Sequence, residues 1–119
     1  MHREMTGMNR IEAIIRPEKV NAVTKALEEK GFAGLTLIEV KGRGRQKGII
    51  LQWRAGEYRV DILPKVKVEV VVKSDRTEEV VDAIVKAAYT GEVGDGKIFI
   101  VPIADAIRVR TKERGEGAL

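Results

Sequence analysis

The chain of 119 residues contains no cysteine, and its single histidine is His2. These absences exclude disulfide bonds, thiolate zinc sites and the Ser-His-Asp and Cys-His catalytic arrangements. Aromatic residues make up only 4% of the sequence, which leaves few rings to stack on nucleic-acid bases. No apolar run approaches the roughly 20 residues of a membrane helix, and the first ten residues show no signal-peptide pattern. We therefore expect a soluble, cytoplasmic protein that does not insert into membranes, and most classes of enzyme become less plausible.

Charge is present in both signs, with 22 basic and 18 acidic residues. The formal net charge of +4 is modest for a protein whose main task is to hold nucleic acid, and it suits small anionic ligands equally well. Hydrophobic residues make up 44% of the chain and charged residues 34%. This composition and length are typical of one soluble globular domain.

The sequence repeats a strand-then-helix pattern. Ile11–Ile15 and Val68–Val72 resemble each other, and each is followed by an amphipathic helical pattern. The first pattern predicts a helix over about 17–30, which opens at Pro17 and ends at Gly31. The second predicts a helix over about 76–89.

The second helix carries a candidate start signal. Asp75 and Glu78 have the spacing of a capping box, in which a side chain at the helix start and one three residues later satisfy free backbone amides. The spacing predicts a helix that starts near Ser74 or Asp75.

Strands are predicted at 35–41 and 58–73 and from Lys97 onward, with a short final strand that carries Arg108 and Arg110. The order β-α-β-β-α-β predicts a ferredoxin-like α+β fold, in which both helices cover one face of a four-stranded antiparallel sheet. The other face is too apolar to be solvated comfortably, so we expect a homo-oligomer that packs these faces together. Residues 111–119 are polar and are expected to form a flexible tail.

The segment Gly91–Lys97 carries the strongest functional signal. Its three glycines allow positive φ angles, so successive backbone amides can point into one concavity beside Lys97 that suits a phosphate. The spacing matches a Walker A loop, but here a helix precedes, a strand follows and Ile98 replaces the hydroxyl residue, which argues against that motif. A simple helix-to-strand turn is the alternative interpretation.

Two further elements are basic or rich in glycine. Gly42–Gly48 lies in a loop of about 16 residues where a hairpin needs two to five, and Arg108 and Arg110 alternate near the end of the chain. Each could simply be solvated, but their convergence on the glycine turn would form an anion site. Lys65 could pair with a carboxylate ligand. The carboxylates near these loops show no spacing typical of acid-base catalysis.

With these pieces assembled, the chain resembles the PII nitrogen-regulatory signal-transduction family over residues 8–114. Residues 1–7 would be an N-terminal extension, 8–110 the PII-like domain with a T-loop at about 43–58, and 111–119 a C-terminal tail. The resemblance rests on five ordered segments: Ile14–Pro17, Glu39–Gly48, Val60–Lys67, Thr90–Phe99 and Ile107–Thr111.

The resemblance implies a homotrimer with ATP or ADP bound in the clefts between subunits. It also implies 2-oxoglutarate bound beside ATP through Mg²⁺, with Gln46 at the metal. By this resemblance, Thr36 and Val71 line the adenine pocket. The residues that contact 2-oxoglutarate are Gln46, Leu63, Lys65 and Lys97. The residues that bind the phosphates are Gly44, Arg45, Gln46, Gly94, Asp95, Gly96, Lys97, Arg108 and Arg110.

The resemblance further implies that the T-loop changes conformation with the ligand and engages targets, typically an ammonium-transporter pore and also nitrogen-assimilation enzymes. Trp53 and Arg54 would contact the partner, with Arg54 reaching into the channel. Tyr58 keeps the hydroxyl position used for uridylylation, but the segment Trp53–Tyr58 departs from the family motif. Recruitment to the membrane would occur only through a transporter.

Two other functions remain open from the residues. The first is a ferredoxin-like RNA-binding domain, although Val68–Val72 lacks the aromatic residues that such a domain stacks on bases. The second is a small phosphoryl-transfer enzyme, although no hydroxyl residue lies beside Lys97 and no base is evident.

Overall fold

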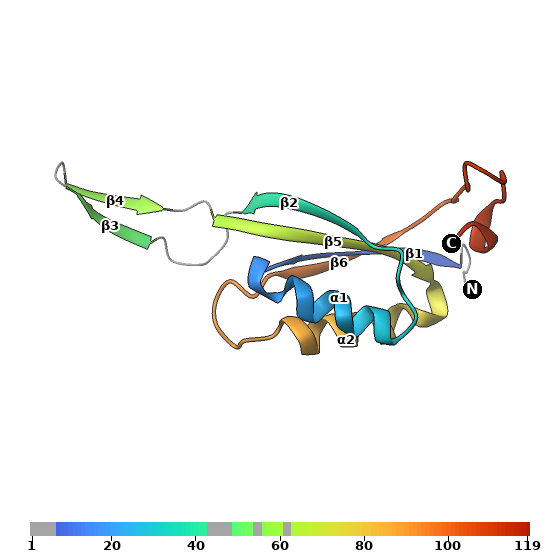
Figure 1. Ribbon diagram of the computed structural model, residues 1–119, viewed down its shortest axis with the longest axis horizontal. Coiled ribbons are helices and arrows are strands. Elements are labelled where there is room, and N and C mark those ends of the chain that lie inside the picture. The colour runs from blue at the N-terminus through green and yellow to red at the C-terminus, as the bar shows by residue number, and fades with distance from the viewer. Residues whose placement is uncertain (1–6, 43–48, 54–55, 61–62) are drawn as a thin grey trace.

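The computed structural model describes residues 7–42, 49–53, 56–60 and 63–119. Four strands form one antiparallel sheet in the order β2-β5-β1-β6, and β3 pairs with β4 in a separate two-stranded sheet (Figure 1). This is the expected ferredoxin-like arrangement. The elements are β1 (Met8–Ile15), α1 (Val20–Glu29), β2 (Thr36–Gly42), β3 (Ile49–Trp53), β4 (Gly56–Val60), β5 (Leu63–Lys73), α2 (Thr77–Ala88) and β6 (Lys97–Pro102), with 3-10 turns at Pro17–Lys19, Ser74–Arg76 and Gly115–Ala118.

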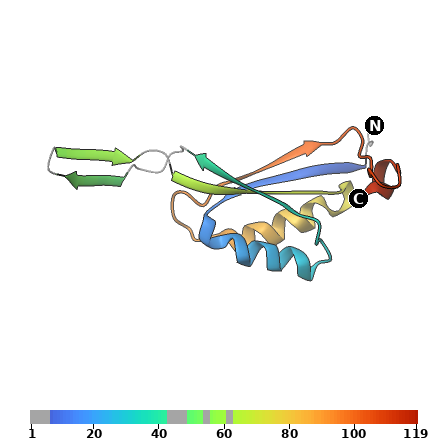
Figure 2. The ribbon, with the colours of Figure 1, turned by 45° about the horizontal axis from the view of Figure 1, so that its top comes forward.

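Both helices lie on one face of the main sheet (Figure 2). The core forms between them and the two central strands, where alternate residues of each strand point inward. The buried side chains of this core include Ile11, Ala13, Ile15, Val68, Val70, Val72, Val23, Leu27, Val80 and Ile84. The alternation predicted for 58–73 is therefore confirmed over β5.

The predicted capping box at Asp75 and Glu78 is wrong. Residues Ser74–Arg76 form a 3-10 turn, and α2 begins at Thr77, one residue after the predicted start; its cap residue Arg76 makes no side-chain capping bond. Arg76 instead donates to the Glu79 carboxylate at 2.9 Å and to the Lys30 carbonyl at 3.1 Å. Its guanidinium also lies 4.1 Å from the ring centre of Phe32, which ties the start of α2 to the end of α1.

The predicted strand over 58–73 is divided in two. β4 ends at Val60 and pairs with β3, whereas β5 starts at Leu63 and pairs with β1 and β2. Alternation alone does not reveal where a strand exchanges one partner for another, because both parts are extended. The long loop therefore contains a hairpin of its own.

The opposite face of the main sheet is uncovered in the described part of the chain. Directly paired residues of antiparallel strands share a face, so the register places Glu12 opposite Glu69 and beside Phe99. Each carboxylate has a cation on its own strand: Arg10 lies 2.7 Å from Glu12, and Lys67 lies 3.4 Å from Glu69. These ion pairs offset the repulsion that two facing carboxylates would otherwise create.

The predicted final strand is wrong, and the predicted tail forms local hydrogen bonds. Ile107 makes a single β-bridge to Arg114, and the chain reverses between them through bonds from the Lys112 amide to the Arg108 carbonyl at 2.7 Å and from the Arg108 amide to the Glu113 carbonyl at 2.9 Å. Arg114 also pairs with Asp105 at 2.7 Å. Local hydrogen bonds thus give the end of the chain a defined path that a pattern of alternating residues does not predict.

Lys112 is the one described non-glycine residue with a positive φ, at 66°. The left-handed region costs a residue with a Cβ roughly 1–2 kcal/mol, part of which glycine recovers. We expect Lys112→Gly to raise the free energy of unfolding by about 1 kcal/mol in urea titrations. Lys112→Ala keeps the Cβ and is the matched control; equal stabilisation by both variants would contradict the explanation.

Candidate anion-binding site

The glycine turn connects the end of α2 to the start of β6. Gly91, Gly94 and Gly96 have φ values of 87°, 102° and 106°, which confirms the predicted need for glycine at these positions. At Gly96 the requirement is also steric, because a Cβ there would collide with the backbone carbonyl of Ile14. The turn therefore packs directly against β1.

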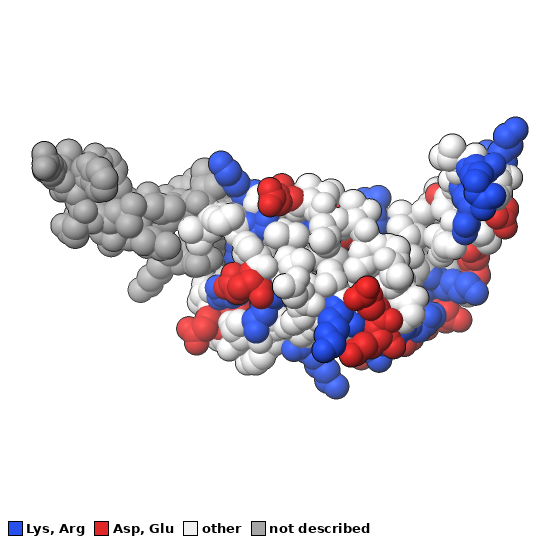
Figure 3. Space-filling model, in the orientation of Figure 1, with Lys and Arg blue, Asp and Glu red and all other residues white. Residues whose placement is uncertain are grey.

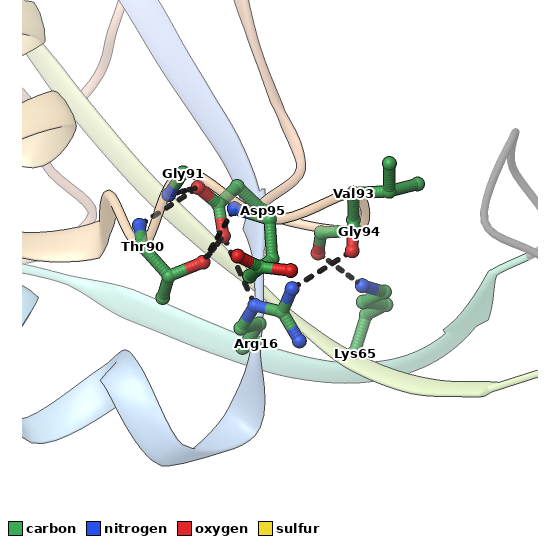
Figure 4. Close-up of polar contacts among 8 residues, drawn as sticks. Arg16, Lys65, Thr90, Gly91, Val93, Gly94 and Asp95 are labelled. Carbon is green, nitrogen blue, oxygen red and sulfur yellow. Dashed lines mark hydrogen bonds and ion pairs between the residues drawn. The ribbon is translucent and has the colours of Figure 1, made fainter.

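Asp95 closes the turn from inside (Figure 4). Its carboxylate accepts hydrogen bonds from the Thr90 hydroxyl, from the Thr90 amide at 2.8 Å, from the Gly91 amide at 2.9 Å and from Arg16 Nε at 3.0 Å. These bonds, led by that of the Thr90 hydroxyl, hold the pKa of Asp95 well below its ordinary value. The carboxylate is thus a constituent of the turn and stays ionised.

Two basic side chains hold backbone carbonyls of the turn (Figure 4). Arg16 Nη2 donates to the Val93 carbonyl at 2.8 Å, and Lys65 Nζ donates to the Gly94 carbonyl at 2.6 Å. Burial lowers the pKa of Lys65, and the nearby Arg16 charge lowers it further. An added anionic group would therefore favour the charged form of Lys65.

Several other predicted residues lie on the uncovered sheet face. Lys97 pairs with Ile14 across β6 and β1, and Thr36 pairs with Glu69, two positions from Val71 on β5. Thr36 and Val71 are thus diagonal neighbours, as lining one adenine pocket requires. Lys65 is on this face as well, opposite Val40, and Leu63 opens β5 opposite Gly42.

Arg108 and Arg110 do not meet the glycine turn in a single chain. The C-terminal segment lies at the opposite end of the main sheet from the turn that follows α2 (Figure 1). Arg108 is engaged there: Nη2 donates to the Leu119 carbonyl at 3.0 Å, and Nε lies 3.8 Å from Glu113. Figure 3 shows basic side chains gathered over this segment.

The remaining predicted positions belong to the long segment between β2 and β5. Gly44, Arg45, Gln46 and Arg54 lie outside the described residues, and for Trp53 and Tyr58 the description covers the strand backbones only. Within the described ranges, no group of three His, Asp or Glu residues is arranged to hold a metal ion. No helix in these ranges is long and apolar enough to cross a membrane.

A cavity of about 350 Å³ lies on the helix side of β6. Its lining is mainly apolar and includes Val81, Val85, Tyr89 and Ile98, with Asp95 and Lys97 at one end. Thr36 and Val71 lie on the other face of the sheet, so the cavity does not include the predicted adenine position, although Asp95, Gly96 and Lys97 of the predicted phosphate site line it.

Sequence reasoning missed Arg16 and Thr90 as parts of the site. Arg16 directly follows β1 and contacts a turn 79 positions away, which no local pattern reveals. Thr90 had a weak signal, since a hydroxyl residue at a helix end before a glycine-rich segment can hydrogen-bond a nearby carboxylate.

These features define an α+β protein of the ferredoxin-like class that carries a braced glycine turn at the edge of an open sheet. The family described as nitrogen regulatory protein P-II matches residues 8–113. The chain is 50% identical over 115 residues to nitrogen regulatory protein P-II 2 of Methanothermobacter thermautotrophicus, covering 97% of this chain and 100% of that one. It is 54% identical over 112 residues to nitrogen regulatory protein P-II of Cereibacter sphaeroides, covering 94% of this chain and 100% of the relative.

A solved structure is similar as well. Arabidopsis thaliana PII bound to citrate superposes with a TM-score of 0.78 at 42% identity, covering 95% of this chain and 92% of that one. The chain therefore belongs to the nitrogen regulatory protein P-II family. It is a nitrogen-regulatory signal protein and not an enzyme, which confirms the resemblance and sets aside the RNA-binding and phosphoryl-transfer alternatives.

Proposed function

We propose that this regulator binds ATP or ADP at sites formed between the subunits of a homotrimer. The observation that carries the proposal is that the glycine turn and the C-terminal segment, which contains Arg108 and Arg110, lie at opposite ends of the main sheet (Figure 1). A phosphate site built from both elements needs two copies of the chain, and a head-to-tail contact between copies closes into a ring where the rotation between them allows it, as in a trimer.

The uncovered sheet face supports an assembly of this kind. Ile38 and Phe99 are exposed by 39% and 46%, although the register places both in the four-stranded sheet. The outer edges of β2 and β6 also carry no partner strand in the described structure. Neighbouring copies would cover these apolar groups and the free edges.

Within each cleft the residues divide by chemistry. The turn from Gly94 to Lys97 and the partner's arginines would bind phosphates, and Thr36 and Val71 would line adenine. Gly44, Arg45 and Gln46 would complete the phosphate contacts.

A second effector, 2-oxoglutarate, would bind beside ATP near Lys65, Leu63 and Lys97. The similar Arabidopsis thaliana structure was solved with citrate, which is a polycarboxylate as 2-oxoglutarate is a dicarboxylate. Mg²⁺ would be held at Gln46 with oxygens of the two ligands. This fits the described residues, which offer no acidic cluster, because Mg²⁺ commonly takes few protein ligands beside phosphate oxygens. The cation would offset the repulsion between triphosphate and dicarboxylate.

The T-loop would transmit the effector signal to the target. An effector that binds one conformation of the T-loop more tightly than another shifts the loop toward that conformation. The expected target is an ammonium transporter, contacted by Trp53 and Arg54, with nitrogen-assimilation enzymes as further targets. The protein would then be cytoplasmic and reach the membrane through that transporter. Tyr58 is the candidate uridylylation site. The role of Arg54 can be tested with Arg54→Ala: a variant that still blocked transport would contradict it.

Calorimetry combined with sedimentation tests the proposal. We expect a trimer that binds one ATP or ADP per chain, and binding of 2-oxoglutarate only when ATP and Mg²⁺ are present. The dependence follows because the metal bridges the two ligands. A monomer, or a protein that binds neither nucleotide, would overturn the proposal.

A further inference from the structure

The glycine turn presents its backbone amides because its carbonyls are held on one side. The Val93 and Gly94 carbonyls are bound by Arg16 and Lys65. Within a planar peptide the carbonyl and the following amide point in opposite directions. Binding these carbonyls therefore turns the amides of Gly94 and Asp95 the other way, and neither amide donates a hydrogen bond to any residue that the structure describes.

Asp95 has no capacity left for a ligand. An ionised carboxylate offers about four lone-pair positions on its two oxygens. Oδ1 accepts from the Thr90 hydroxyl and from Arg16, and Oδ2 accepts from the amides of Thr90 and Gly91. All four positions are used inside the turn, so Asp95 cannot also bind a metal ion or a ligand hydroxyl without losing one of these bonds.

The charge of Asp95 would otherwise oppose the proposed function. A carboxylate beside a phosphate repels it, and the repulsion is stronger near a protein surface than in bulk water. Arg16 forms an ion pair with Asp95 at 3.0 Å, and the two side chains are only 19% and 24% exposed. The pair is thus partly shielded from water and close to neutral as a unit.

We propose that Arg16 and Asp95 are positioning residues, which brace the glycine turn so that its free amides face the nucleotide phosphates, and that neither side chain touches the nucleotide. The inference rests on the proposed nucleotide binding and assigns the two residues a role in that site. Arg16 acts at both ends of the brace, because it binds the Asp95 carboxylate and the Val93 carbonyl at once (Figure 4).

The brace and simple charge repulsion predict opposite effects for Asp95→Asn. If the charge only repelled phosphate, its removal would tighten ATP binding. If Asp95 holds the turn, asparagine weakens binding, because its amide group cannot accept the bonds that one carboxylate oxygen now receives. Loss of hydrogen bonds to a charged group lowers affinity by about tenfold or more.

Glu92→Gln is the matched control. Glu92 is an exposed acidic residue in the same turn, and no hydrogen bond or ion pair of its carboxylate is present among the described residues. It removes the same charge and leaves the brace intact, so ATP affinity should stay unchanged or rise. Thr90→Val is a milder second variant that removes one bond to Asp95 and should weaken binding less than Asp95→Asn does.

The experiment measures ATP affinity by calorimetry for the wild type, Asp95→Asn, Arg16→Gln and the double variant, with the amide resonances of residues 94–96 followed by NMR. The effects of substituting residues that act as one unit are not additive. The ATP affinity of the double variant should therefore be about that of the single variant with the lower affinity. The amide resonances should shift in each brace variant before ligand is added, and stay in place in Glu92→Gln.

Two results would overturn the inference while the proposed function stands. One is a wild type that binds ATP together with an Asp95→Asn variant that binds equally well or better. The other is a double variant whose loss equals the product of the two single losses, which would indicate independent contacts with the ligand. A wild type that does not bind ATP would instead refute the proposed function itself.

Discussion

Alanine at position 96 will destabilise the protein by about 3 kcal/mol and abolish nucleotide binding, because it combines a positive-φ penalty with a backbone clash. Gly96 has a φ of 106°, and its missing Cβ leaves room for the Ile14 carbonyl of the neighbouring strand. The carbonyl belongs to a central strand of the sheet and cannot move away cheaply. Urea unfolding of Gly96→Ala, with calorimetry of the folded fraction, measures both effects.

Gly31 provides the control for this variant. It has a φ of 89° at the end of α1, but a Cβ there would meet nothing within 4 Å. Gly31→Ala therefore carries the conformational penalty alone, about 1 kcal/mol, and should leave nucleotide binding unaffected. If both alanine variants lost the same stability, the contact with β1 would have no role in closing the turn.

The second large effect is complementation between two inactive variants. Lys97→Ala removes a basic group beside the glycine turn. Arg110→Ala removes one from the segment at the opposite end of the main sheet (Figure 1). Arg110 is exposed and has no hydrogen bond or ion pair with a described residue, so its loss should leave the fold intact. Each pure variant should bind ATP about 10 to 100 times more weakly, since a charge-assisted bond to phosphate is lost.

Refolding the two variants together at equal amounts distinguishes a shared site from a site within one chain. In randomly mixed trimers with head-to-tail contacts, about one quarter of the clefts combine an intact turn with an intact arginine pair. These clefts should regain wild-type affinity, and calorimetry should report that fraction of sites. If the site lay within one chain, every chain would still lack one group and mixing would recover nothing.

Much of the fold could be predicted from local patterns. Alternating apolar residues in Val66–Val72 and helical spacing in 20–27 and 80–88 specify their own elements, because each pattern reflects burial of one face. The predictions that failed concerned boundaries and partners. Asp75 lies in a 3-10 turn, and the extended run 58–73 belongs to two sheets. Both depend on which neighbour satisfies the backbone, which is decided outside the segment.

The candidate site also combines features that a local pattern predicts with contacts that only the folded chain shows. Glycine at 91, 94 and 96 is a local requirement of the backbone, so its spacing could be recognised directly. Asp95 was expected beside the phosphates, and its four bonds place its carboxylate inside the turn. Arg16 had no assigned role, since its position before Pro17 does not indicate which distant loop it meets.

The sequence alone determined the order of strands and helices, the glycine turn and the basic segments, because these are short-range properties of the chain. Only the tertiary structure decided that Arg16 meets Asp95 across 79 positions and that Arg108 and Arg110 lie far from the turn. The physical reason is the antiparallel register. It brings the end of β1 to the start of β6 and carries the segment after β6 to the other end of the sheet, and no single segment encodes that arrangement.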